Sequence, residues 1–118
     1  MLTFVVCAVV LAACGAEATS GCADVVGVEV FLVGEGLQFD VTVASADTGW
    51  EKYADRWEVR DPDGTVLGAR ELAHPHVDEQ PFTRSETVEV PLGTDRVEVF
   101  AHDSVEGFCG ASMAVALP

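Results

Sequence analysis

Basic residues are scarce in this chain of 118 residues, where six Lys and Arg stand against 20 Asp and Glu. The formal net charge is −14 at pH 7, and there is a single lysine. Binding to nucleic acid needs a basic surface that neutralises phosphates, so this function is excluded. Hydrophobic residues make up 49% of the chain, which is enough for a packed core. The length predicts one domain.

Signals of catalysis are also missing. There is no GxSxG motif, and the glycines mark turns rather than a phosphate-binding loop. His102 and Asp103 are adjacent, which does not suit the geometry of a catalytic triad. Asp78 and Glu79 are neighbours that would point to opposite faces of a strand, which does not suit glycoside hydrolysis. We therefore expect no enzyme activity and no cofactor.

The apolar run at residues 2–13 is too short to cross a bilayer, which needs roughly 20 residues. Its length is typical of the core of a signal peptide. The run ends in a branched residue, two small residues and a cysteine, Leu11-Ala12-Ala13-Cys14.

This ending resembles the lipobox of bacterial lipoproteins in residue type and position. The resemblance implies cleavage just before Cys14 and a diacylglycerol on its thiol. The chain departs from the lipoprotein pattern in having no Lys or Arg before the apolar run. The alternative is an ordinary secretory signal that is cut nearby.

The domain organisation follows from this resemblance. We expect a signal peptide at residues 1–13, a lipidated tether of small and polar residues at 14–21, and a β-domain at 22–118. The protein would lie outside the cytoplasm in the cell envelope, with the membrane as its partner. Gly15 stands where Asp commonly retains lipoproteins at the inner membrane, so a host with two membranes would place it in the outer one.

Two of the four cysteines are expected to pair. Cys7 would leave with the signal peptide and Cys14 would carry lipid, which leaves Cys22 and Cys109. An exported protein lies in an oxidising compartment, so these two predict a disulfide. The loop it closes would stabilise the fold by about 4 kcal/mol. The alternative, two thiols that bind metal, has no CxxC spacing to support it.

Period-two patterns indicate half-buried antiparallel strands. We expect inward faces formed by Val26, Val28, Val30 and Leu32, by Leu37, Phe39, Val41 and Val43, and by Met113, Val115 and Leu117. Pro62-Asp63-Gly64 predicts a hairpin turn in which Asp63 is the side-chain acceptor.

Six or seven such strands predict an all-β antiparallel sandwich of about seven strands. It resembles immunoglobulin-like or fibronectin type III domains in strand count, spacing and a Trp in the third strand. Antibody domains pair cysteines on the second and sixth strands, whereas here Cys22 precedes the first strand and Cys109 the last. In a sandwich both thiols would lie at one pole, which agrees with their expected pairing.

The histidines are expected at that same pole, because the strands that end near His74 and His102 both end there. The candidate binding or metal site, for Zn or Cu, consists of His74, His76, His102, Glu79 and Asp103. The alternative is a loop that prolines stiffen and whose histidines are bonded locally. Loops on a rigid sandwich are the usual place for binding residues, so the partner would be a protein or a small ligand.

The stretches "WEVRDPDGTVLG", "HPHVDEQPFTRS" and "VEVFAHDSVEGFCG" resemble a group of small exported bacterial proteins of uncharacterised function, over Tyr53 to Gly110. The resemblance implies no chemistry. It implies one recurring unit made of His74, His76, Glu79, Gln80, Arg84, His102 and Asp103. We therefore expect a membrane-anchored lipoprotein whose sandwich is a binding or structural module, with Zn or Cu binding as the alternative.

Overall fold

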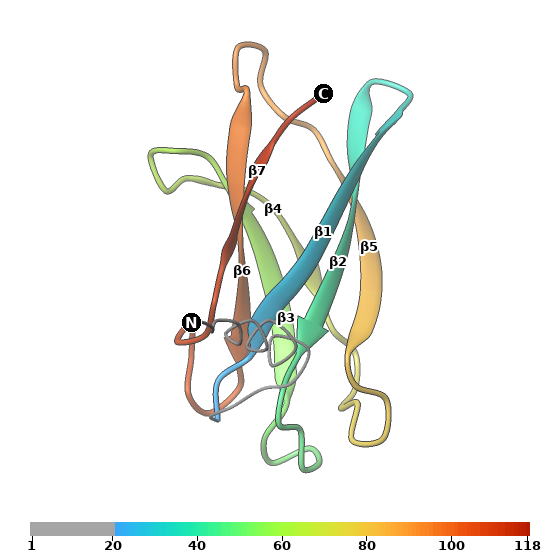
Figure 1. The fold of residues 1–118 in the computed structure, drawn as a ribbon, viewed down its shortest axis with the longest axis vertical. Helices are drawn as coiled ribbons and strands as arrows, with labels where there is room; N and C mark the ends of the chain where they lie inside the picture. The colour runs from blue at the N-terminus through green and yellow to red at the C-terminus, as the bar shows by residue number, and fades with distance from the viewer. Residues whose placement is uncertain (1–20) are drawn as a thin grey trace, which may run out of the picture.

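Seven β-strands make up the computed structural model, which describes residues 21–118 (Figure 1). They are β1 (Asp24–Val33), β2 (Gly36–Ala44), β3 (Ala54–Arg60), β4 (Val66–Glu71), β5 (Phe82–Val88), β6 (Arg96–Asp103) and β7 (Met113–Ala116). One sheet has the order β1-β2-β5 and the other β4-β3-β6-β7, and all paired strands are antiparallel. The expected all-β fold with antiparallel strands is confirmed.

The core lies between the two sheets and follows the period of two. In β2, alternate residues Leu37, Phe39, Val41 and Val43 are buried, because successive side chains of a strand point to opposite faces. The largest fully buried side chain is that of Trp57 in β3. From β7 and the chain end, Met113, Val115 and Leu117 pack partly buried against this core, as expected.

Strand β1 departs from the expected alternation near its start. Val25 pairs with Val43 and Gly27 pairs with Thr42, so a β-bulge lies at Val26. The extra residue shifts the alternation, and Val25 rather than Val26 joins the core with Val28. The expectation that Val26 shares the inward face was therefore wrong, because a β-bulge cannot be recognised from the alternation of the sequence. Leu32, also expected on the inward face, is 72% exposed and is not part of the core.

The β3–β4 hairpin lies where the turn residues predict it, but its acceptor differs. Asp61 Oδ1 accepts hydrogen bonds from the backbone N–H groups of Asp63, at 2.9 Å, and Thr65, at 3.0 Å. Gly64 has a φ of 89°, in the left-handed region that favours glycine. The prediction that Asp63 is the acceptor was wrong, since the carboxylate of Asp61, two residues earlier in the chain, accepts the hydrogen bonds from these N–H groups.

One end of the sandwich gathers three loops and the start of β1. Loops 45–53, 72–81 and 104–112 join strands whose paired ends lie beside Asp24, and Figure 1 shows them at the lower end of the molecule. We name these loops, with the start of β1, the entry pole. The opposite end, with turns 34–35, 61–65 and 89–95, is the far pole. Residues 21–118 contain no helix long and apolar enough to cross a membrane.

Candidate functional site at the entry pole

A buried carboxylate joins two loops of the entry pole. Asp47 is 8% exposed. Its Oδ1 accepts hydrogen bonds from Ser45 Oγ at 2.7 Å and from the Ala54 N–H at 2.9 Å. Its Oδ2 accepts from the His76 N–H at 2.8 Å. Loop 45–53 is thereby bonded both to the start of β3 and to loop 72–81.

The amide of Gln80 adds a second brace between the same loops. Its Oε1 accepts from the Ser45 N–H at 2.8 Å. Its Nε2 donates to the His76 carbonyl at 2.8 Å and to Ser45 Oγ at 3.2 Å. Because both ends of the amide are bonded, loop 72–81 is held in one position against loop 45–53.

The ring of His76 belongs to the packed interior. It stacks on Phe82 with ring centroids 3.8 Å apart, and the residue is 4% exposed. Arg84 Nη2 donates to His76 Nε2 at 2.9 Å, so the proton of the neutral ring lies on Nδ1, a buried atom with no hydrogen-bond partner. Burial lowers the pKa of His76, and the charges of Arg84 and His74 lower it further. The ring is therefore neutral at pH 7.

The other two histidines have different neighbours. His74 is exposed, its ring centroid lies 4.6 Å from that of His76, and its Nδ1 lies 3.0 Å from the Pro75 carbonyl. His102 Nδ1 lies 2.6 Å from Asp55 Oδ1, and its ring meets Phe108 edge-on. The structure thus brings His74 and His76 together and sets His102 against other partners. In the described part of the chain, no group of three or more His, Cys, Asp or Glu is arranged to hold a metal ion.

The two carboxylates of the candidate site are also engaged. Glu79 Oε1 lies 3.4 Å from Arg84 Nη2. Asp103 is fully buried, with Oδ1 2.7 Å from Lys52 Nζ, and its Oδ2 accepts from the N–H groups of Val105 and Glu106. Burial raises the pKa of Asp103, but these hydrogen bonds outweigh it and hold the pKa below its ordinary value. Asp103 is thus an ionised structural group.

The unit implied by the resemblance to uncharacterised exported proteins is divided in the structure. Its members in one network are His74, His76, Glu79, Gln80 and Arg84. His102 and Asp103 are bonded to other groups instead. The ion pair of Lys52 with Asp103 was not predicted from the sequence. Lys52 is the single lysine of the chain and lies in a polar loop, which could have indicated a structural role.

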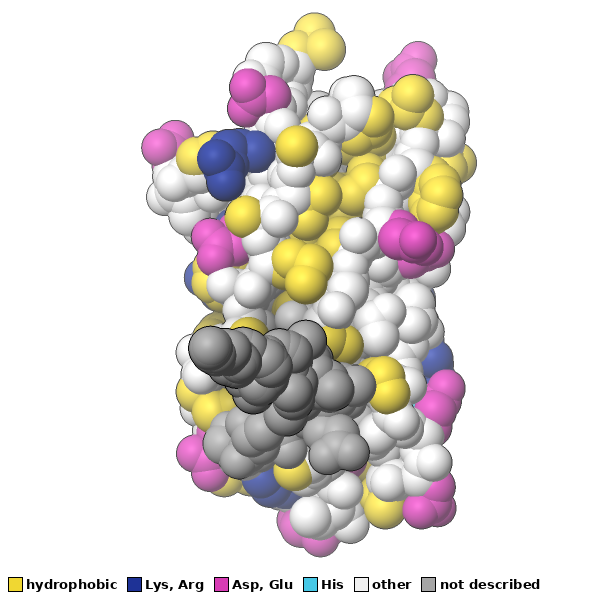
Figure 2. All heavy atoms as spheres, viewed as in Figure 1, with side chains coloured by type: hydrophobic (Ala, Val, Ile, Leu, Met, Phe, Trp, Pro, Cys, Tyr) yellow, Lys and Arg dark blue, Asp and Glu magenta, His cyan; other side chains and the backbone are white. Residues whose placement is uncertain are grey.

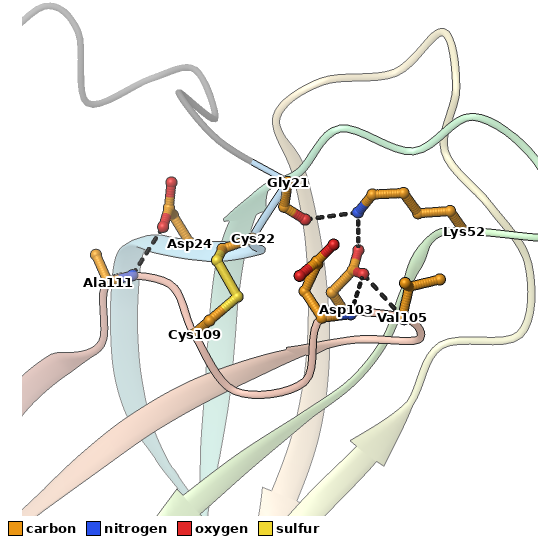
Figure 3. Close-up of a disulfide and its surroundings, with 9 residues drawn as sticks. Gly21, Cys22, Asp24, Lys52, Asp103, Val105, Cys109 and Ala111 are labelled. Atoms are coloured by element: carbon orange, nitrogen blue, oxygen red, sulfur yellow. Dashed lines mark hydrogen bonds and ion pairs between the residues drawn. A yellow bond between two sulfur atoms is a disulfide. The ribbon is translucent and has the colours of Figure 1, made fainter.

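Three ties fix the start of the described chain to the entry pole (Figure 3). Cys22 and Cys109 form the expected disulfide, with Cα atoms 5.4 Å apart. Lys52 Nζ donates to the Gly21 carbonyl at 2.5 Å, and the Ala111 N–H donates to Asp24 Oδ1 at 2.7 Å. The chain therefore enters the domain at a defined point beside loop 104–112.

A glycine allows this close approach. A Cβ at Gly110 would lie 2.0 Å from the Ala23 carbonyl oxygen and 2.6 Å from its carbon. Both atoms are backbone, which cannot rotate away as a flexible side chain would. Only the lack of a side chain at Gly110 lets loop 104–112 lie against the start of β1 and bring Cys109 to Cys22.

The expected signal peptide, the lipobox with Cys14, Cys7 and residues 14–20 of the tether lie outside the described residues. The comparisons with known proteins bear on this part of the prediction. No family model matches the chain.

Over 82 residues the chain is 48% identical to a protein of Halomicrobium mukohataei that bears the name "Putative lipoprotein". The match covers 70% of this chain and 40% of that protein, so the chain matches well under half the length of its curated relative. The relative comes from a halophilic archaeon, which gives no support to the expected outer membrane.

Among solved structures, the fold is similar to a variant of superoxide reductase (neelaredoxin) from Archaeoglobus fulgidus in the reduced form, with a TM-score of 0.49 and 13% identity over 77% of this chain and 85% of that one. The chain is thus similar in sequence to a protein named as a lipoprotein. It folds into two antiparallel β-sheets.

Proposed function

We propose that this protein is an extracytoplasmic lipoprotein, anchored to the cell membrane through lipid on Cys14. The observation that carries the proposal is the set of three ties at Gly21, Cys22 and Asp24. A domain held by an anchor on its N-terminal side needs its first residues joined firmly to the core. The sequence similarity to a named lipoprotein supports the same function.

The sandwich would serve as a binding or structural module of the immunoglobulin-like or fibronectin type III-like kind. Two antiparallel sheets of three and four strands, with the fully buried Trp57 on the third strand, support this assignment. Loops 45–53 and 72–81, braced by Asp47 and Gln80, form a rigid surface for a protein or small ligand.

Cys14→Ser tests the anchor, with Cys7→Ser as the matched control in the same apolar segment. The full-length gene is expressed in a host that lipidates exported proteins, and detergent-phase partition and intact mass are measured. Wild type and Cys7→Ser should enter the detergent phase with the mass of a lipidated chain that begins at Cys14. Cys14→Ser should remain in the aqueous phase. Wild-type protein with an unmodified N-terminus would contradict the proposal.

Zn or Cu binding is the second candidate, and one observation favours it. The rings of His74 and His76 lie side by side, with their centroids 4.6 Å apart. Two imidazoles give half of the four ligands that Zn²⁺ takes in structural sites, so the loop or a ligand would have to supply the rest.

Metal titration separates this second candidate from the first. If His74 and His76 bind metal, saturating Zn²⁺ or Cu²⁺ should raise the melting temperature of wild type. His74→Ala should remove the rise, whereas His102→Ala should keep it, because His102 is bonded to Asp55. A rise that depends on His102 as well would restore the original three-histidine site. If metal does not raise the melting temperature of wild type, both the two-histidine and the three-histidine metal sites are contradicted.

A further inference from the structure

We infer that the entry pole contacts the lipid interface of the membrane through Trp50, Val77 and Val105. This inference rests on the proposed anchor at Cys14. The three side chains come from three different loops of the pole, 45–53, 72–81 and 104–112. They are 67%, 51% and 60% exposed, respectively. Each loop of this pole thus presents at least one large apolar side chain to its surroundings, and loop 104–112 also exposes Phe108, at 43%.

The chemistry of this group suits a bilayer interface. Trp50 packs edge-on against Tyr53, with ring centroids 5.6 Å apart. Trp and Tyr are enriched at membrane–water interfaces, because their rings are apolar and their N–H or O–H groups remain hydrated. Val77 and Val105 add apolar surface without charge. Such a group would gain free energy by leaving water for the interfacial region of the lipid.

The tether fixes which end of the domain faces the lipid. Cys14 and Cys22 are eight positions apart, so the chain between them spans at most about 28 Å. The long dimension of the molecule is 47 Å, and Cys22 lies at the entry pole. In an inverted domain, Cys22 would lie above the lipid by most of the 47 Å length of the molecule. This distance is longer than the tether can span. The entry pole is therefore the end that can lie on the membrane.

Carboxylates around the three apolar side chains decide which lipid surface accepts them. Exposed acids of the entry pole are Glu51, Asp78, Glu79 and Glu106. They repel anionic headgroups over a Debye length of about 10 Å at 0.1 M salt and about 3 Å at 1 M. Contact should therefore form on zwitterionic lipid at any salt concentration, and on anionic lipid only when salt is high.

The far pole supplies a matched control. It also exposes apolar side chains, among them Leu32, at 72%, and Leu92, fully exposed, and Figure 2 shows hydrophobic side chains near the upper end of the molecule. Nothing in the structure identifies what would cover them. Because the tether cannot bring this end to the lipid, a Trp placed at Leu92 reports on nonspecific contact.

The test uses the full-length, lipidated protein in vesicles of brominated phosphatidylcholine, whose acyl-chain bromines quench nearby Trp. Flotation with the vesicles first shows that the anchor is present. Trp57 is fully buried, and the variant Trp50→Phe measures the fluorescence that Trp57 alone contributes. The control carries Leu92→Trp in the Trp50→Phe background. Emission of Trp50 should shift to the blue and be quenched, whereas the Trp at position 92 should keep the emission it has in unbrominated vesicles.

Each other outcome overturns the inference in a distinguishable way. Protein that floats while Trp50 remains unquenched refutes the contact and leaves the anchor intact. Equal quenching at positions 50 and 92 refutes the upright orientation. Protein that does not float refutes both the anchor and the contact. With anionic brominated lipid, quenching of Trp50 at low salt equal to that at 1 M would refute the role given to the four carboxylates.

Discussion

Asp47 holds the entry pole together at the scale of single residues. Its carboxylate accepts hydrogen bonds from the N–H groups of Ala54 and His76, both of which belong to buried residues. Asp47→Ala would remove the hydrogen bonds of these two buried donors to the carboxylate, which should lower the free energy of unfolding by about 2–4 kcal/mol. Urea unfolding measures this loss. Asp78→Ala, an exposed acid of the same pole, should change stability little. Equal losses in both variants would contradict the role of Asp47.

His76 should make stability depend on pH. Its pKa is lowered in the folded state by burial, then by the charges of Arg84 and His74, so the unfolded chain binds the proton more tightly. Its contribution to stability is then complete above about pH 6.5 and is lost as the pH falls below that value.

His76→Phe tests this dependence, because Phe keeps the stack on Phe82 and does not titrate. Between pH 7 and pH 5, the free energy of unfolding should fall less in His76→Phe than in wild type. His74→Gln removes an exposed imidazole and should retain most of the wild-type slope. A slope for His76→Phe equal to that of wild type would show that other groups govern this range.

At the scale of secondary-structure elements, the position of loop 104–112 against strand β1 depends on Gly110. Gly110→Ala would push a Cβ into the backbone of Ala23, so strand β1 and the loop would have to separate. We expect a loss of about 3 kcal/mol in unfolding free energy and a larger fraction of free thiols at Cys22 and Cys109. Gly27→Ala, on the same strand, meets only Thr42 at an ordinary 3.4 Å and should cost far less. Complete disulfide formation in Gly110→Ala would contradict this account.

The strands could be predicted from the sequence, because burial on one face leaves an alternation that can be read directly. The inward faces of β2 and β7 follow it. The bulge at Val26 and the acceptor Asp61 could not be predicted, since each depends on where a partner strand or turn N–H lies.

The candidate site was predictable only in its location. The position of the histidines at one end of the sandwich follows from strand order, which the sequence indicates. Their partners do not follow, because His76 turns inward onto Phe82 and His102 meets Asp55. Such choices are set by packing between loops that are distant in sequence, as with Ser45 and Gln80.

Negative charge dominates the molecule as a whole. The net charge is −14, and ion pairs already involve four of the six basic residues, Lys52, Arg56, Arg60 and Arg84. The surplus carboxylates repel one another more in the folded state than in the expanded chain. NaCl shortens the Debye length to about 3 Å at 1 M, so added salt should raise the melting temperature.

Neutralising exposed acids tests this expectation. The triple variant Asp63→Asn, Asp78→Asn, Glu89→Gln removes three negative charges from exposed positions. Its melting temperature should exceed that of wild type at low salt and should rise less between 0.1 and about 1 M NaCl. A salt dependence identical to that of wild type would show that self-repulsion does not limit stability.

The disulfide also decides how the molecule carries mechanical load. Cys22 leads into β1 of the three-stranded sheet, and Cys109 lies between β6 and β7 of the four-stranded sheet. A pull on a membrane anchor would reach both sheets at once through this covalent link, instead of peeling β1 from β2 one hydrogen bond at a time. In reduced protein the same pull would be resisted at the entry point by noncovalent contacts, among them those of Lys52 with Gly21 and of Asp24 and the Val25 N–H with Ala111.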